Sequence, residues 1–391
     1  MNKVVSAHPT ASTSRQALTR IQRLSCLGLG GQIVMPALMH ELHGLVPACS
    51  NHFKWAGPEL EIANSYTDGP VIPELLEVFH SEQYRKAERL VLQSFTEVMQ
   101  EPQLNAVEHV SRSFLKVDWP NFLKSDAYNL FYRPLDICSS LTIKLGEHDR
   151  GLGMMFVCRD AGAAEFTFRD YRLLELAVPF MTHALAGSGI TTPLAESEDR
   201  AMVIADAQGR ILHWSAEARR LLLMIRHEEW SPKLDWHSAC GRTLPEPAVR
   251  LCRQLVGVCE GKMQVAPPVW HHRNAWGSFE LRAYPLQAER QFQEPMQSRL
   301  DENTLHDSSS IGITVQRKEP LSLQLLRKAE SLPLSRREVD FCIHAATGCT
   351  HAQIAERMGI TEHSAITHGR NVYGKLGVHS RVALFNALRA F

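Results

Sequence analysis

Short helices separated by tight turns are the clearest pattern of apolar and polar positions in this chain, and they occupy its C-terminal end. Ser335 is followed three positions later by Glu338, and Thr350 is followed in the same way by Gln353. At this spacing the side chain of the N-cap residue accepts the amide of the third helical residue, whose own side chain accepts the N-cap amide. The pattern therefore predicts one helix after Ser335 and a second after Thr350. Gly348 and Gly359 come at the ends of these two helices and are suited to the turns that follow the helices.

A third helix is predicted from about 362 to 376, with Thr361 as its N-cap. Its period divides it into two faces. One face is suited to a core and carries Ala365, His368, Val372 and Leu376. The other is polar and basic and carries His363, Thr367 and Arg370, with Asn371 at its edge. A short helix with such a face can enter the major groove of DNA and donate to base edges and phosphates.

An amphipathic stretch precedes these helices and predicts a connector helix over residues 321 to 331. Leu323, Leu326 and Ala329 recur along it at helical spacing. From Leu321 to the end of the chain, Arg and Lys outnumber Asp and Glu by nine to five. Because the whole chain is neutral, with 42 residues of each sign, any nucleic-acid surface must be local, and this end offers one.

The middle of the chain has the alternation of strands and turns expected of an α/β domain. An apolar strand over 203 to 205, a tight turn over 206 to 209 and a strand over 210 to 214 lead into a helix. That helix should bury Ala218, Leu221 and Leu222. Residues 279 to 284 and 311 to 315 are suited to the last two strands, with the charged, Gln-rich stretch from 287 to 310 as a long insertion between them.

The first part of the chain ends in a strand over 152 to 157, a polar loop over 159 to 164 and a helix that starts at 166 to 170. The helix should bury a stripe of apolar side chains at Leu173, Leu174, Ala177, Phe180, Met181 and Leu185. A stretch rich in Gly, Ser, Thr and Pro from 187 to 199 predicts a linker to the middle domain. The apolar run from 24 to 39 is broken by glycines and a proline, so we interpret it as the first helix of a folded domain rather than a signal peptide.

Composition excludes several classes of protein. The length of 391 residues predicts two or three domains, and 44% hydrophobic with 21% charged residues is ordinary for globular chains. The nine cysteines contain no C-x-x-C pair and fit buried thiols in a reducing compartment. No G-x-S-x-G, H-E-x-x-H, P-loop or Rossmann motif is present, so the sequence offers no catalytic residues on which to base an enzymatic function.

Two further groups of residues, in the middle and first domains, could form ligand sites. His237, Cys240, Cys252, Cys259 and the pair His271 and His272 could supply soft metal or haem ligands, but their spacing supports no specific site, so no metal or cofactor is predicted. Trp55 and Trp214 could line a ligand pocket, although buried aromatic side chains more commonly serve packing.

The C-terminal residues resemble the LuxR-type helix-turn-helix. The matching residues are Leu334-Ser-x-Arg-Glu338, Gly348, Ile354-Ala-Glu-Arg-Met-Gly-Ile-Thr361, His368, Lys375-Leu-Gly-Val378, Ser380 and Arg381. The resemblance implies four helices, dimerisation through the last one (381 to 389), and DNA contacts from the third. With the polar face described above, it gives the candidate DNA-binding residues Thr361, His363, Ser364, Ile366, Thr367, Arg370, Asn371 and Lys375.

The sequence departs from the LuxR pattern at several positions of this region. Ile366 stands where the family usually has a lysine that faces DNA, and could contact a thymine methyl instead. Ala365 and Cys342 replace larger apolar residues. Gly369 and Gly374 should each weaken the third helix by ~1 kcal/mol. These departures predict weaker or differently tuned DNA binding.

The two upstream segments resemble sensor domains. Residues 131 to 135, the strand at 152 to 157 and the helix entry at 166 to 170 resemble a GAF domain, and the strand, turn, strand and helix from 203 resemble the opening of a PAS domain. Neither the acidic pair and lysine of a receiver domain nor the residue set of an acyl-homoserine-lactone domain can be assembled. The predicted fold class is multi-domain α+β: GAF-like and PAS-like α/β sensor domains, then an all-α LuxR-type domain. The expected boundaries are a tail (1–17), the GAF-like domain (18–186), the linker (187–199), the PAS-like domain (200–318), the connector helix (319–331) and the LuxR-type domain (332–391).

We therefore predict a cytoplasmic bacterial transcription regulator and not an enzyme. Its expected partners are double-stranded DNA, a second copy of the chain and a small-molecule ligand of unknown identity, with RNA polymerase as a further candidate and no membrane. An alternative stays open, in which the departures have removed useful DNA affinity and the protein acts by pairing with another regulator. His368 lies near the inward face and is more easily explained by packing than by contact with a base.

Overall fold

The computed structural model describes residues 11–69, 72–101, 104–109, 114–147, 150–186, 194–239, 241–259, 269–286 and 310–389. The chain forms two compact units. Unit 1 comprises residues 1–189 and 198–317, and unit 2 comprises residues 190–197 and 318–391. The predicted insertion from 287 lies outside the described residues up to residue 309.

The first half of unit 1 is built on a five-stranded antiparallel sheet with the order β2-β1-β5-β4-β3. Its strands are β1 (Ser50–Ala56), β2 (Ile62–Thr67), β3 (Val107–His109), β4 (Ile137–Glu147) and β5 (Arg150–Asp160). Its helices are α1 (Ala11–Ser25), α2 (Gly31–Leu45), α3 (Pro73–His80), α4 (Glu82–Val91), α5 (Phe95–Gln100), α7 (Trp119–Lys124), the π-helical turn η1 (Tyr128–Tyr132) and α8 (Phe168–Ala186).

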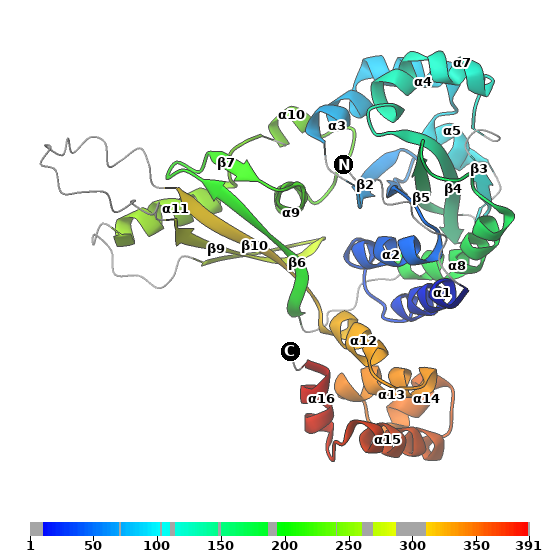
Figure 1. The fold of residues 1–391 in the computed structure, drawn as a ribbon, viewed down its shortest axis with the longest axis vertical. Helices are drawn as coiled ribbons and strands as arrows, with labels where there is room; N and C mark the ends of the chain where they lie inside the picture. The colour runs from blue at the N-terminus through cyan, green and yellow to red at the C-terminus, as the bar shows by residue number, and fades with distance from the viewer. Residues whose placement is uncertain are drawn as a thin grey trace, which may run out of the picture. The chain divides into compact units, whose positions relative to one another are not determined.

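Helices cover both faces of this sheet (Figure 1). α1, α2 and α8 pack on one another, and α8 lies against β3, β4 and β5. A second apolar cluster, which includes Tyr84, Met99 and Phe122 with Met154 of β5, joins the short helices to the sheet. Because both faces are covered, β4 is buried almost continuously instead of at alternate positions.

The strand and the helix predicted near the end of this domain are present, but its beginning differs. The predicted strand over 152 to 157 lies within β5. At the start of α8, the Asp170 carboxylate accepts hydrogen bonds from the amide and the hydroxyl of Thr167, at 2.8 and 3.0 Å. The expectation of a tail up to residue 17 is wrong, because α1 begins at Ala11. The run from 24 to 39 is not one helix either: it crosses the break between α1 and α2, where Gly28 has a φ of 64°.

The second half of unit 1 contains another five-stranded sheet, in the order β7-β6-β10-β9-β8. Its strands are β6 (Leu194–Ala205), β7 (Ile211–Trp214), β8 (Val269–Asn274), β9 (Gly277–Pro285) and β10 (Ile311–Pro320). Its helices are α9 (Ala216–Arg226), α10 (Trp236–Ala239) and α11 (Glu246–Cys259). β6 and β10 cross the boundary between the units, since unit 2 takes their ends at 194–197 and 318–320.

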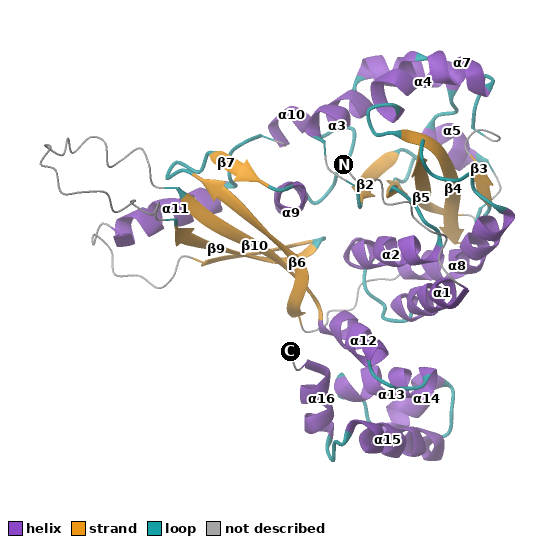
Figure 2. Cartoon of the chain, in the orientation of Figure 1, coloured by secondary structure: helices purple, strands orange, loops and turns teal. Residues whose placement is uncertain are grey.

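The predicted strands of this sheet are confirmed. The turn after β6 is held by the Asp206 carboxylate, which accepts the amides of Gln208 and Arg210 at 3.0 and 2.8 Å. Gly209 completes the turn with a φ of 80°. The linker expected over 187 to 199 is too long, because β6 already begins at Leu194. Numbered within each sheet, both sheets have the order 2-1-5-4-3. Figure 2 shows the strands in orange among the purple helices.

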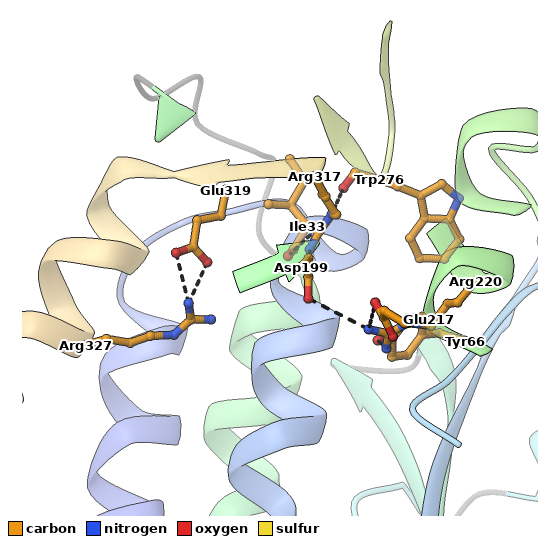
Figure 3. A network of polar contacts seen from close by, with 9 residues as sticks. All are labelled: Ile33, Tyr66, Asp199, Glu217, Arg220, Trp276, Arg317, Glu319 and Arg327. Carbon is orange, nitrogen blue, oxygen red and sulfur yellow. Dashed lines mark hydrogen bonds and ion pairs between the residues drawn. The ribbon is translucent and has the colours of Figure 1, made fainter. Parts of the chain in front are cut away.

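A network of polar contacts connects strands and helices of unit 1 (Figure 3). The Arg317 side chain is only 4% exposed; its guanidinium donates to the carbonyls of Trp276 and Ile33, at 2.8 and 3.3 Å, and pairs with Asp199 at 3.0 Å. Asp199 also lies 3.8 Å from Arg220, which donates to the Tyr66 hydroxyl at 2.6 Å. The network therefore connects β2 and α2 of the first half with β6, α9 and β10 of the second.

The described residues of unit 2 form five helices: α12 (Leu321–Ser331), α13 (Arg336–Ala346), α14 (His351–Met358), α15 (Glu362–Leu376) and α16 (Arg381–Arg389). The predicted bounds of the connector helix, the third helix and the last helix are confirmed. α12 packs on α13 and α16 and buries the predicted Leu323, Leu326 and Ala329. Near its start, Glu319 accepts two hydrogen bonds from Arg327, at 2.9 and 2.7 Å.

Among the described residues, none of the helices combines the length and the apolar character that crossing a bilayer requires.

Candidate nucleic-acid interface

Three N-caps fix where the helices of unit 2 begin. The Glu338 carboxylate accepts the Ser335 amide at 2.6 Å, and the Gln353 side chain accepts the Thr350 amide at 2.9 Å. Thr361 caps α15 by accepting the Ser364 amide at 3.2 Å. Both predicted capping boxes are confirmed. These bonds are made within three residues, which is why the sequence pattern located the helices so closely.

The turn between α14 and α15 sets the direction of the third helix. Gly359 ends α14 in the left-handed conformation, with φ 62° and ψ 41°. Its amide donates to the Glu356 carbonyl at 3.2 Å. A side chain with a Cβ is strained in this conformation, so the glycine is required for a turn this short.

The inward face of α15 is narrower than expected. Ala365 and Val372 are buried as predicted, whereas His368 and Leu376 are only half-buried. Gly369 is the third buried residue of the helix. α15 packs mainly on α13 and α14, and the buried Phe341 of α13 lies directly over Gly369.

The polar face of α15 is open to solvent. His363, Thr367, Arg370 and Asn371 are exposed, and Ser364 and Ile366 are half-buried beside them. Arg370 forms no hydrogen bond or ion pair with any residue that the structure describes. Its guanidinium is therefore available to a phosphate or a base edge. The helix thus presents one cationic group within a row of short polar side chains.

Two threonines of the candidate site already have hydrogen bonds within the helix. The hydroxyl of Thr367 donates to the His363 carbonyl at 3.0 Å. The Thr361 oxygen lies 2.8 Å from the Ser364 hydroxyl in addition to capping the helix. Their hydroxyls can still accept from a ligand, but each also has a structural role.

Lys375 has a role that the sequence pattern did not predict. Its ammonium lies 2.7 Å from the Glu338 carboxylate of α13, and the Glu338 side chain is 5% exposed. Burial raises the pKa of Glu338, but the hydrogen bonds from Lys375 and Ser335 outweigh burial, so the pKa lies below its ordinary value. Lys375 therefore compensates a buried charge, and its placement among the DNA contacts stays a prediction.

Further basic side chains lie on α13, α14 and α16 of the same unit. Arg337 donates to the Met358 carbonyl at 3.3 Å, and Arg381 donates to the Gly348 carbonyl at 3.3 Å. Arg357 and Arg336 are exposed. These groups place positive charge on the same small domain as α15, in a chain that is neutral overall.

The two glycines of α15 differ in their surroundings. A Cβ at Gly369 would come within 2.8 Å of the Phe341 ring, whereas a Cβ at Gly374 would meet nothing within 4 Å. Treating both glycines as mere weaknesses of the helix was therefore wrong for Gly369. There the missing side chain lets α15 approach α13, and Phe341 fills the space.

We expect Gly374→Ala to stabilise α15 by about 0.5 to 1 kcal/mol, because alanine loses less conformational freedom on forming a helix. Gly369→Ala should instead destabilise it by about 1 kcal/mol or more, because overpacking against Phe341 outweighs that gain. Hydrogen exchange of the 362–376 amides in the two matched variants measures both effects. Equal protection in the two variants would contradict the role assigned to Phe341.

Comparison with known proteins assigns the domain that carries this face. Residues 332–387 match the model of GerE, described as bacterial regulatory proteins, luxR family. Residues 332–387 form a LuxR-family helix-turn-helix domain. The predicted LuxR resemblance is thereby confirmed for this part of the chain, and the LuxR family is not a class of enzymes. The GAF and PAS resemblances stay predictions.

Solved structures similar to the chain include VqmA bound to DPO, at 16% identity, over 48% of this chain and 79% of that one, with a TM-score of 0.18. A Vibrio cholerae VqmA–ligand–DNA complex is 12% identical over 49% and 83%, with a TM-score of 0.20. The E. coli DhaR(N)–DhaL complex is 12% identical over 80% and 92%, with a TM-score of 0.21. TM-scores this low establish no shared overall fold. No curated protein matches the chain.

The other candidate sites of the sequence do not assemble. Among the described residues, no three His, Cys, Asp or Glu side chains lie close enough to hold a metal ion, and Cys240 lies outside those residues. Trp55 packs against Phe53 and Trp276, with ring centroids 4.8 and 6.0 Å apart. The Trp214 ring lies under the Arg219 guanidinium at 4.8 Å. Both tryptophans thus have packing partners.

Proposed function

We propose that the chain is a transcription regulator that binds double-stranded DNA through α15 of its LuxR-family domain. The observation that carries the proposal is the division of this helix. Ala365, Gly369 and Val372 are buried against the domain, while His363, Thr367 and Arg370 face solvent. A capped helix with such a face has the shape and the donors to read a major groove.

The protein would bind as a homodimer through α16. Val382 on this helix is 70% exposed, and an apolar side chain this exposed is suited to contact with a second copy. Two recognition helices related by a twofold axis imply an inverted-repeat operator with half-site centres ~34 Å apart. RNA polymerase remains a candidate partner of the DNA-bound dimer.

The two halves of unit 1 would act as sensor domains, GAF-like and PAS-like respectively. Two features support this part of the proposal. Both sheets have the same strand order, 2-1-5-4-3, and each half has its own helices packed on its sheet. A ligand or partner bound there would change DNA affinity by a coupling of typically ~1 to 3 kcal/mol.

The alternative of a helix that has lost its DNA affinity rested partly on the two glycines. α15 nevertheless runs unbroken from Glu362 to Leu376, and the buried Gly369 has a packing partner in Phe341. The glycines therefore give no reason to expect a disordered recognition helix, and Ile366 is the departure on which this alternative now depends.

Arg370→Ala is expected to weaken DNA binding about tenfold and to lower the slope of log affinity against log salt by about one, because one phosphate contact is lost. A mobility-shift assay with the chain's own upstream DNA, at several salt concentrations, measures both effects. Arg250→Ala is the matched control: Arg250 is an exposed arginine of α11, with 63% of its side chain accessible.

The control should bind like the unchanged protein. Two outcomes would count against the proposal: failure of the unchanged protein to shift any duplex, or equal loss of affinity in both variants. Unchanged affinity in Arg370→Ala alone would refute the assignment of this residue.

A further inference from the structure

A cavity of about 100 Å³ lies in unit 1, over the strands of the first sheet. Strands β1, β2, β4 and β5, helix α3, the turn η1 and the segment after α9 contribute to its wall. Most of the wall is apolar or aromatic, and includes Leu75, Leu76, Phe79, Phe131, Phe156 and Trp230. An apolar cavity of ~150 Å³ in another protein admits benzene, so this smaller cavity is suited to an apolar body smaller than a benzene ring.

One side chain in this wall is a lysine. Lys54 is the single Lys or Arg among the described residues that line the cavity, and Asp and Glu are absent from that set. The Lys54 ammonium lies 4.1 Å from the ring centre of Phe79 and 4.9 Å from that of Phe156. It forms neither a hydrogen bond nor an ion pair with any described residue.

The other basic groups of the wall are neutral near pH 7. Burial lowers the pKa of His52 to about 4 and that of His80 to about 3. Burial also lowers the pKa of Lys54, to about 8, against the opposing attraction of Glu88 and Cys158. Lys54 therefore keeps its charge in most molecules at pH 7.

Lys54 is half-buried, and an ammonium held among aromatic rings without a hydrogen-bonding partner in the protein is costly. A ligand that supplies an anionic oxygen would lower that cost. We propose that the cavity binds a small monocarboxylate with a compact apolar body, its carboxylate on the Lys54 ammonium and its body against the aromatic wall. Such a ligand would be the signal in the sensing role of the proposed function. Its regulatory effect rests on that function, whereas its binding does not.

The ligand would touch the residues that connect the two halves of unit 1. The Trp230 amide donates to the Asn64 side chain at 2.6 Å, and the Ser65 hydroxyl donates to the Trp230 carbonyl at 2.8 Å. Tyr66, whose ring stacks on Trp230 at 6.3 Å, accepts the hydrogen bond from Arg220 described above. Occupancy of the cavity is therefore placed to change the network that ends at Arg317.

Calorimetric titration of the full chain at pH 7 tests the proposal, with propionate, butyrate and isovalerate compared with propionamide, butyramide and isovaleramide. At least one carboxylate should bind about tenfold more tightly than its amide, because only the carboxylate accepts a charge-assisted hydrogen bond. Lys54→Met should reduce that ratio to about one, and Lys54→Arg should retain part of it. Lys86→Met is the control, since Lys86 is a 73% exposed lysine of α4.

Equal affinity for acid and amide, an unchanged preference in Lys54→Met, or binding of none of the three acids would overturn the proposal. Lys54→Met removes an unpaired charge and should not impair folding, which circular dichroism checks. The DNA assay is independent: a protein that shifts DNA but binds no carboxylate refutes only the ligand, and one that binds carboxylate but shifts no DNA refutes only the regulator.

Discussion

Asp199→Ala should lower the free energy of unfolding of unit 1 by about 3 kcal/mol, because it removes the carboxylate that pairs with the buried Arg317 guanidinium at 3.0 Å. Arg317 is held 4% exposed by the carbonyls of Trp276 and Ile33, so it cannot turn to water without losing those bonds as well. Asp199→Asn should cost less, because an amide oxygen can still accept from Arg317.

Tryptophan fluorescence during denaturant unfolding measures this effect in the full chain. All seven tryptophans lie within the residues of unit 1, so the signal reports that unit alone. The double variant Asp199→Ala with Arg317→Met should recover part of the lost stability, because the arginine charge is removed together with the carboxylate that pairs with it. A double variant less stable than Asp199→Ala by the full cost of Arg317→Met would show that the pair does not act as described.

Lys375→Met should destabilise the LuxR-family domain by about 2 kcal/mol. The substitution leaves the Glu338 carboxylate, which is 5% exposed, without its ammonium partner. The expected loss of stability is smaller than for a fully buried ion pair, because the Lys375 side chain is 44% exposed to solvent. Adding Glu338→Gln should restore much of the loss, since the amide keeps the capping box without burying a charge.

The same pair sets an acid limit for this domain. The pKa of Glu338 is depressed in the folded protein, so its contribution is fully present above the unfolded value near 4.5 and disappears as the pH falls through the folded value. Hydrogen exchange of the α13 and α15 amides should therefore lose protection below about pH 4.5 in the unchanged protein and less steeply in Glu338→Gln. Parallel pH profiles in the two proteins would contradict the assignment.

Variants at Lys375 and Arg370 should distinguish an effect on folding from an effect on DNA binding. Arg370 has no partner among the described residues, so its removal should reduce affinity and leave stability unchanged. Lys375 should act mainly through stability, and a loss of DNA affinity in Lys375→Met that Glu338→Gln restores would be an indirect effect. The resemblance to LuxR-type domains placed both residues among the DNA contacts without distinguishing these two roles.

The elements that the sequence located well are those fixed by nearby residues. Helix caps such as Thr361 are completed within three positions, and the period of Leu323, Leu326 and Ala329 marks one face of a single helix. The turn after β6 is likewise made by Asp206 with the next few amides. Such signals depend on local geometry alone, and the bounds of α12, α15 and α16 followed from them.

The sequence alone thus determined the helices of the DNA-binding domain and which side of α15 is polar, because these depend on contacts a few residues long. Only the tertiary structure decided that Lys375 neutralises Glu338 and that Phe341 requires a glycine at Gly369. It also decided that Lys54 lines a cavity to which the described residues contribute no carboxylate. Each of these depends on residues far apart in the chain, whose proximity is set by how helices and strands pack and not by any pattern along the sequence.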